Sequence, residues 1–177
     1  MESNTQNEDT QRLALRAQRG DERAVMQLFE RYEAQIYRYV TYRILSVDAL
    51  DVTTQIFEQM VRGLPTFNYT DGSFEAYLYK VAADSVADYV LQRGWRQMQT
   101  NQASNEDFEL SADDSEHADH ERVRKALNEL SYIEQGIIIL RLIEGYTCPE
   151  VADILRIPTD TVLEQQRESL YKLAKLL

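Results

Sequence analysis

Residues 147–167, TCPEVADILRIPTDTVLEQQR, contain the clearest fold signal in the chain. The first four match a capping box, in which the Thr147 and Glu150 side chains bond to free backbone N–H groups at the start of a helix. Pro149 is tolerated there because the first helical positions need no N–H donor. We therefore expect a short helix that begins near Thr147 and runs to Leu155.

The residues that follow predict a turn and a longer helix. Residues 156–158, RIP, form a turn of three residues, and Thr159 opens the last helix. Helical spacing places these side chains on its inner face: Val162, Ser169, Leu173 and Leu176. Two helices joined by a tight turn, the second one longer, have the layout of a helix-turn-helix. A plain helical bundle is the alternative.

The segment before this motif is also helical. Residues 131–134, SYIE, match a second capping box, and the helix that they start is apolar nearly all round up to Glu144. Such a helix is expected in the middle of a bundle. Gly145 ends it, and a short amphipathic helix from Val123 to Leu130 precedes it.

The N-terminal half predicts four more helices and no strand. Apolar residues from Val25 to Val40 recur at helical spacing. Further helices are expected over about 10–19, 48–62 and 74–96, with a turn-rich loop at 67–73. The expected fold is all-α: two small helical domains, 1–99 and 121–177, joined by an acidic flexible linker at 100–120, with the helix-turn-helix in the C-terminal domain.

Charge and composition support this division. The chain has 177 residues, with 19 Lys and Arg against 30 Asp and Glu, and a net charge of −11. Residues 100–120 contain seven acids and no basic residue, which indicates a solvated linker. Hydrophobic residues make up 44% of the chain, enough for a core. A single cysteine excludes an internal disulfide, and no apolar run could span a bilayer, so we expect a cytoplasmic protein without membrane insertion.

The sequence gives no support to an enzyme. It has no glycine-rich phosphate loop and no convincing pairing of a nucleophile with histidine. His117 and His120 lie one helical turn apart and could form a metal pair, but their setting is the expected linker. Cys148 lies near a helix N-terminus and could sense redox state, although a buried spectator is the simpler interpretation. We therefore expect no catalytic residue, metal or cofactor.

The chain resembles the extracytoplasmic-function sigma factors of the sigma-70 family from about Leu13 to Leu176. In the first domain, residues 48–53, DALDVT, leading to Phe57, resemble the family's polymerase-clamp-binding segment. Residues 72–82, GSFEAYLYKVA, continued at 88–90, resemble its promoter-melting segment. In the second domain, three segments resemble the domain that reads the upstream promoter element: 126–130, ALNEL; 140–147, LRLIEGYT; and 150–155, EVADIL.

The chain departs from the family pattern at three places. Thr54-Gln55 stands where the family has a Gln-Glu pair, and only Arg93 and Arg96 remain of a basic run after Tyr89. The last helix differs most. The family carries several Lys and Arg early in it, whereas residues 161–168, TVLEQQRE, have one Arg against two Glu. The recognition helix is therefore divergent.

The resemblance implies which residues bind the two macromolecular partners. Polymerase-facing residues are expected at Asp48, Asp51, Thr54 and Phe57, although helix capping would also explain the aspartates. Phosphate contacts are expected from Lys80, Arg93 and Arg96. Unstacked bases are expected to meet Phe67, Tyr69 and Trp95, or the loop from Asn68 to Ser73; burial in the core is the alternative for the aromatics. Major-groove contacts are expected from Thr159, Thr161, Leu163, Gln165 and Arg167.

These residues imply a sigma factor that directs core RNA polymerase to promoter DNA. An alternative is a sigma-like adaptor that binds polymerase or an anti-sigma partner and has weak or lost promoter binding. A helix-turn-helix regulator that acts without polymerase is a third interpretation. An anti-sigma protein is left open as a further partner. The acidic linker could cover basic surface in the free protein, although a solvated spacer is the simpler interpretation.

Overall fold

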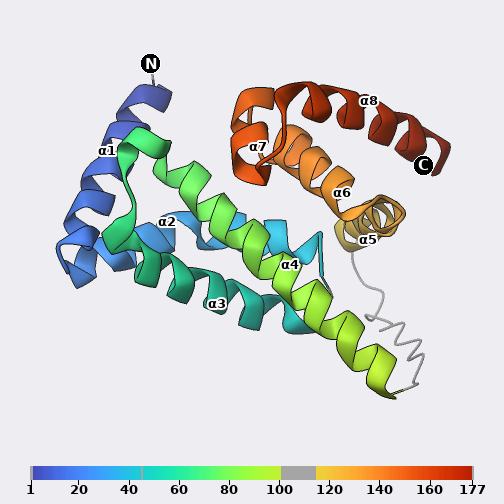
Figure 1. The fold of residues 1–177 in the computed structure, drawn as a ribbon, viewed down its shortest axis with the longest axis horizontal. Coiled ribbons are helices and arrows are strands. Elements are labelled where there is room, and N and C mark those ends of the chain that lie inside the picture. The colour runs from blue at the N-terminus through green and yellow to red at the C-terminus, as the bar shows by residue number, and fades with distance from the viewer. Residues whose placement is uncertain (1, 45, 101–114, 177) are drawn as a thin grey trace.

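The computed structural model describes residues 2–44, 46–100 and 115–176 of the chain, and side chains within 8–44, 47–70, 72–94 and 122–176 (Figure 1). Helices and helical turns account for all the regular structure in these ranges, so the expected all-α class is confirmed. Within the same ranges, no helix is long and apolar enough to cross a membrane.

The first lobe, defined here as α1 to α4, forms the N-terminal part. Its helices are α1 (Glu2–Gln18), α2 (Glu22–Thr41), α3 (Ser46–Gly63) and α4 (Phe74–Thr100). Helix α1 begins earlier than the predicted position near residue 10. The Asp21 side chain caps α2 by accepting from the N–H groups of Arg23 and Ala24, at 3.0 and 3.2 Å. Two 3-10 turns, Leu64–Thr66 and Tyr69–Asp71, shape the loop before α4.

The second lobe, defined here as α5 to α8, contains the predicted helix-turn-helix. Its elements are α5 (Ser115–Asn128), α6 (Tyr132–Ile138), the π-helical turn η3 (Ile139–Ile143), α7 (Cys148–Leu155) and α8 (Thr159–Leu176). Both predicted capping boxes are present, at the starts of α6 and α7. Arg156 adopts the left-handed conformation (φ 56°, ψ 44°), which turns the chain from α7 into α8.

Two features of the second lobe differ from the prediction. The helix expected from residue 131 to Glu144 is α-helical only to Ile138 and then widens into η3, where the Glu144 N–H bonds to Ile139 O at 3.0 Å. Residue 100 and residues 115–120 were predicted as linker but belong to α4 and α5. The rest of the predicted linker, 101–114, lies outside the described residues, and the domain boundaries at 99 and 121 remain a prediction.

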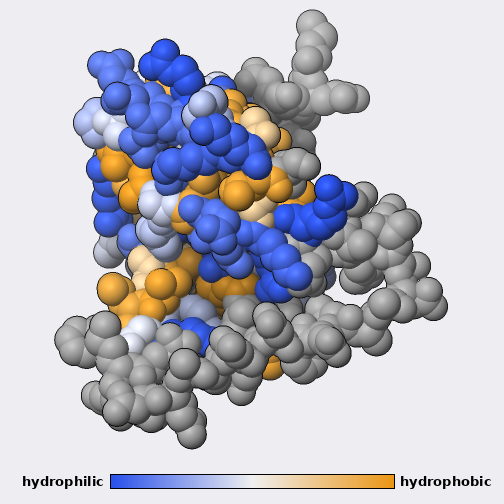
Figure 2. Space-filling model, turned by 90° about the vertical axis from the view of Figure 1, so that its right-hand side faces the viewer, coloured by the Kyte–Doolittle hydropathy of each residue, from blue (hydrophilic) through white to orange (hydrophobic). Residues whose placement is uncertain are grey.

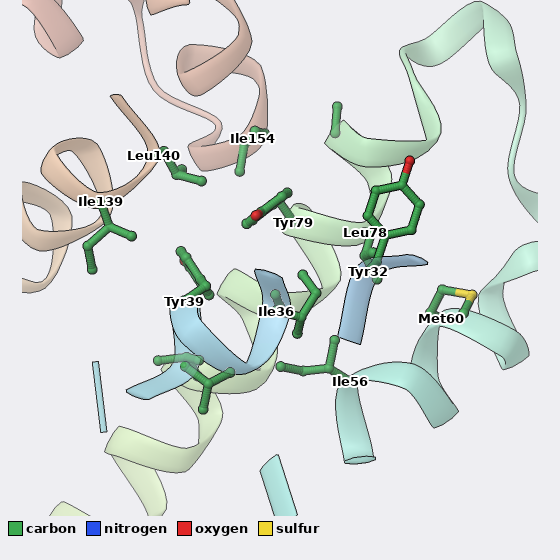
Figure 3. Packing of buried hydrophobic residues seen from close by; sticks show 14 of the residues in the cluster. Tyr32, Ile36, Tyr39, Ile56, Met60, Leu78, Tyr79, Ile139, Leu140 and Ile154 are labelled. Atoms are coloured by element: carbon green, nitrogen blue, oxygen red, sulfur yellow. The ribbon is translucent and has the colours of Figure 1, made fainter. Parts of the chain in front are cut away.

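Buried side chains of both lobes form one continuous cluster. Tyr39 of α2 and Tyr79 of α4 pack edge to face with ring centroids 5.4 Å apart. Leu140 of η3 and Ile154 of α7 lie beside them on the second-lobe side (Figure 3). All four are at most 2% exposed. The two lobes therefore pack against each other.

Candidate functional site

The first group of candidate residues lies between α3 and α4. A depression of about 260 Å³ is lined by Asp48 and Asp51 from α3 and by Asp88, Tyr89 and Arg93 from α4. Arg93 donates to Asp48 at 3.3 Å and to the Tyr89 hydroxyl at 2.9 Å, and that hydroxyl donates to Asp48. Burial and the bond to Asp48 raise the pKa of Tyr89. The structure thus joins Asp48, a predicted polymerase contact, to Arg93, a predicted DNA contact.

The other predicted polymerase residues occupy two faces of α3. Asp51 and Thr54 are exposed, and the Thr54 hydroxyl bonds to the backbone oxygen of Leu50 at 2.9 Å. Phe57 is only 6% exposed and packs against Phe29 with ring centroids 4.7 Å apart. Phe57 therefore lies in the core of this structure, and its aromatic ring supports α3 from within.

Sequence reasoning missed two exposed apolar residues beside this acidic face. Val47 and Leu50 are 73% and 62% exposed at the start of α3. The buried face of α3 contains Ala49, Val52 and Ile56, so Val47 and Leu50 fall outside the inward stripe. That mismatch in the spacing could have identified them. Apolar residues rimmed by carboxylates are suited to a protein contact.

The loop before α4 uses its polar side chains as helix caps. The Asn68 side chain accepts from the N–H two residues later at 3.1 Å, and the Ser73 hydroxyl accepts from the N–H three residues later at 3.1 Å. Tyr69 and Phe67 are half-buried and lie with ring centroids 4.8 Å apart. The Tyr69 hydroxyl donates to the backbone oxygen of Gln11 at 3.3 Å. Asn68 is the member of this set that is exposed.

The candidate cations of α4 are far apart. Lys80 pairs with Asp153 of α7 at 2.8 Å, and its side chain is 23% exposed. Arg93 lies 13 residues further along the helix, about 20 Å at the usual rise. Trp95 and Arg96 belong to α4, but their side chains lie outside the described residues. Lys80 and Arg93 therefore belong to different surfaces.

The candidate residues of α8 differ in exposure. Leu163 is 53% exposed and Arg167 is exposed, whereas Thr159, Thr161 and Gln165 are half-buried. The structure places all five on the second helix of the helix-turn-helix.

Acidic residues line the outer face of α8. Asp160, Glu164 and Glu168 are exposed and recur every four residues, so they lie above one another on the helix. Leu170 and Tyr171 are 41% and 65% exposed further along. Figure 2 shows the molecule from the side toward which α8 runs, where hydrophilic residues cover much of the coloured surface and hydrophobic ones show between them. The carboxylates of Asp160, Glu164 and Glu168 would repel the phosphate groups of DNA.

The histidine pair gains no support as a metal site, and the single cysteine gains none as a redox sensor. His117 and His120 lie outside the residues whose side chains are described. In the part of the chain that the structure does describe, no three potential ligands gather to hold a metal. Cys148 is half-buried, with its sulfur 4.0 Å from Gln166 Oε1.

The first lobe matches a known protein family. Residues 28–96, from α2 to near the end of α4, match the family model described as Sigma-70 region 2. In Streptomyces coelicolor, the ECF RNA polymerase sigma factor BldN is 28% identical over 170 residues, which cover 93% of this chain and 64% of BldN. The chain therefore spans somewhat less than two thirds of that relative. The ECF RNA polymerase sigma-E factor of Escherichia coli is 27% identical over 162 residues, covering 85% of this chain and 84% of that protein.

Two solved structures have a similar fold. CnrH, solved with the cytosolic domain of CnrY, matches with a TM-score of 0.72 and 23% identity, covering 93% of this chain and 94% of CnrH. The sigma factor RpoE of Bartonella quintana, solved with the anti-sigma factor NepR, matches with a TM-score of 0.70 and 15% identity, covering 85% and 94%. At these identities the likeness shows the arrangement of the helices.

Proposed function

We propose that this chain, as a member of the sigma-70 family and of its extracytoplasmic-function group, directs core RNA polymerase to promoters and so starts transcription. The order of the two lobes along the chain supports this function. The region 2 match covers α2 to α4, and a helix-turn-helix follows in the second lobe. That combination carries the proposal, because a helix-turn-helix regulator acting alone needs no region 2.

The start of α3 is proposed as the polymerase contact. Asp51 and Thr54 are exposed there, next to the exposed Val47 and Leu50. An interface of this kind combines an apolar centre with charged residues at its rim. Phe57, which is buried, would hold the helix in place from below.

The loop before α4 and the outer face of α4 are proposed as the surface for the opened promoter strands. Asn68 is exposed, and Tyr69 and Phe67 are half-buried aromatics that a base could reach. Stacking on an aromatic ring is worth about 1–3 kcal/mol per base. Lys80 and Arg93 would contact phosphates. Both are paired with carboxylates in this structure, so DNA would have to replace those partners.

Helix α8 is proposed as the weaker of the two promoter contacts. Its outer acids oppose phosphate binding, and Arg167 is the one basic residue among residues 159–168. Polymerase would supply the missing affinity by holding both lobes near the promoter, which raises the effective DNA concentration at α8. In this role the protein would act in the cytoplasm without catalysing a reaction of its own.

The direct test measures how tightly the protein binds purified core RNA polymerase that is immobilised on a sensor surface. Asp51→Lys reverses one charge on the proposed contact, and Glu33→Lys reverses one exposed charge on α2 as the matched control. We expect nanomolar to micromolar binding by the wild type and the control, and at least tenfold weaker binding by Asp51→Lys. If both variants lost affinity for polymerase equally, the contact would not lie on α3. If the wild type did not bind polymerase, the proposed function would be refuted.

A further inference from the structure

A side chain of α1 holds the loop that precedes α4. Gln18, the last residue of α1, is half-buried. Its Nε2 atom donates to the backbone oxygen of Leu64 at 3.0 Å and to that of Phe67 at 2.6 Å. A side-chain amide nitrogen carries two hydrogens, so these bonds use every donor that the group has. The acceptors lie 46 and 49 residues further along the chain, so the contact joins two separate elements of the first lobe.

The two carbonyl groups lie at the two ends of one turn. Leu64 begins the 3-10 turn Leu64–Thr66, and its oxygen also accepts from the Phe67 N–H at 3.1 Å. Phe67 follows the turn in an extended conformation, with φ −67° and ψ 133°. Because Gln18 bonds to the residue that begins the turn and to the residue that leaves it, its amide fixes the path by which the chain enters the loop.

Helix α1 contacts the loop at a second point. The Tyr69 hydroxyl donates to the backbone oxygen of Gln11 at 3.3 Å. Gln11 and Gln18 are seven residues apart, so they lie on the same face of α1. The Phe67 ring packs against Tyr69 and Tyr77, with ring centroids 4.8 and 4.7 Å apart. One face of α1 therefore holds the loop on both sides of this aromatic ring.

The candidate base-reading residues come directly after the second carbonyl that Gln18 binds. Asn68 is exposed, and Tyr69 is half-buried. Groups that already hold their binding conformation lose less conformational freedom when a ligand binds. A loop whose path is fixed by α1 is thus suited to select a base. Helix α1 ends before residues 28–96, which match the region 2 family model, so this support comes from outside that match.

We propose that Gln18 is a positioning residue for the opened promoter strand: its bonds to Leu64 and Phe67 set how Asn68 and Tyr69 meet a base. In this role Gln18 touches no DNA and acts through the loop. The proposal rests on the proposed function, because it takes the loop as the surface for the opened strand. Helix α1 then takes part in reading the promoter as well as in covering the core.

Hydrogen exchange in the free protein tests the Gln18 contact without polymerase or DNA. Gln18→Met keeps a side chain of similar length but donates no hydrogen bond. We expect the Phe67 amide to exchange about three- to tenfold faster in this variant, the effect of about one hydrogen bond on local opening. Amides of α2 and α3 should keep their rates. The matched control Gln27→Met, at an exposed position of α2, should leave the Phe67 rate unchanged. An unchanged Phe67 rate in Gln18→Met overturns the proposal.

The second experiment measures base reading by the full-length protein bound to core RNA polymerase. A random pool of short single-stranded oligonucleotides is selected on the wild-type complex, with core enzyme alone as the background. The best binder is then made again with an abasic site at its most strongly selected position. The ratio of the two dissociation constants, called here the abasic penalty, isolates the contribution of one base. The wild-type complex should show a penalty of at least about fivefold, the lower limit for one stacked base.

Gln18→Met should lose this abasic penalty without losing general affinity for DNA. We expect the penalty to fall below half of its wild-type value while binding of the abasic oligonucleotide stays unchanged, and Gln27→Met should keep the full penalty. A variant that was merely less stable would bind both oligonucleotides more weakly in the same proportion. A full penalty in Gln18→Met overturns the positioning role. Failure of the proposed function appears in the wild type instead, as a complex that does not form or shows no penalty, and the positioning role then fails with it.

Discussion

The contact between Arg38 and Glu144 should hold a measurable share of the stability of the folded chain. We consider Arg38→Ala, Glu144→Ala and the double variant, which together form a thermodynamic cycle. Each single substitution removes the two bonds of 2.7 and 3.0 Å that join the guanidinium group to the carboxylate. Arg38→Ala also leaves the Glu144 carboxylate with the 3.0 Å hydrogen bond from the Tyr79 hydroxyl in place of three bonds.

The expected magnitude follows from the exposure of the two side chains. Breaking a fully buried ion pair costs about 3–5 kcal/mol. The Glu144 side chain is 3% exposed but that of Arg38 is 43% exposed, so the attraction is partly screened by solvent. We expect Arg38→Ala to lower the free energy of unfolding by about 2 kcal/mol, within the ~1.5–3 kcal/mol of a hydrogen bond to a charged group. This loss of unfolding free energy has an upper limit, because the lobes can separate and let water reach the Glu144 carboxylate.

Urea unfolding followed by circular dichroism measures this cycle. We expect a coupling energy of about 1–2 kcal/mol between the two positions. The Arg38→Ala transition should also broaden, since lobes that have separated no longer unfold as one unit. A coupling energy below about 0.5 kcal/mol, the limit for independent sites, would contradict the role given to this ion pair.

Three further predictions concern individual side chains. Burial raises the pKa of Glu134, but the bond from Lys172 and the capping contacts outweigh it and hold the pKa below the ordinary 4.5; its stabilisation is present above pH 4.5 and is lost as pH falls through the lowered value, so thermal melting of Glu134→Gln should depend less on pH in this acid range. In Gly63→Ala the new methyl group would meet the Tyr77 hydroxyl, so we expect a loss of about 1–3 kcal/mol in urea unfolding that Tyr77→Phe partly restores. Phe57→Ala should cost about 3–5 kcal/mol as a core truncation, and unchanged stability would show that the ring is not packed as described.

Helix positions followed from local chemistry and were largely predictable. The two capping boxes lie within four residues of sequence each, and their bonds are formed inside the same turn. Turn residues and apolar spacing act over equally short distances, so α2, α3, α7 and α8 were predicted close to their observed positions. The π-helical turn η3 was missed because a run of isoleucine and leucine gives no signal that separates it from an α-helix.

Contacts between the lobes could not be predicted from the sequence. Arg38 and Glu144 are 106 residues apart, and pairing between charges at that separation leaves no periodic pattern. Lys80 was predicted as a DNA contact from its position within the melting-like segment, but its partner Asp153 depends on how the lobes pack. Phe57 matched a polymerase-binding pattern, yet its burial depends on Phe29 from another helix. Residue type was informative in each case, whereas the neighbour was set by tertiary structure.

The proposed function, that this chain starts transcription with core RNA polymerase, can be tested by transcription in vitro. Core enzyme is incubated with pooled genomic fragments, with and without the purified protein, and the 5′ ends of the transcripts are mapped. We predict a set of start sites that require the protein and share an upstream sequence, with output reduced by Asp51→Lys and kept by Glu33→Lys. Polymerase that binds the protein but initiates at no new site would contradict the claim.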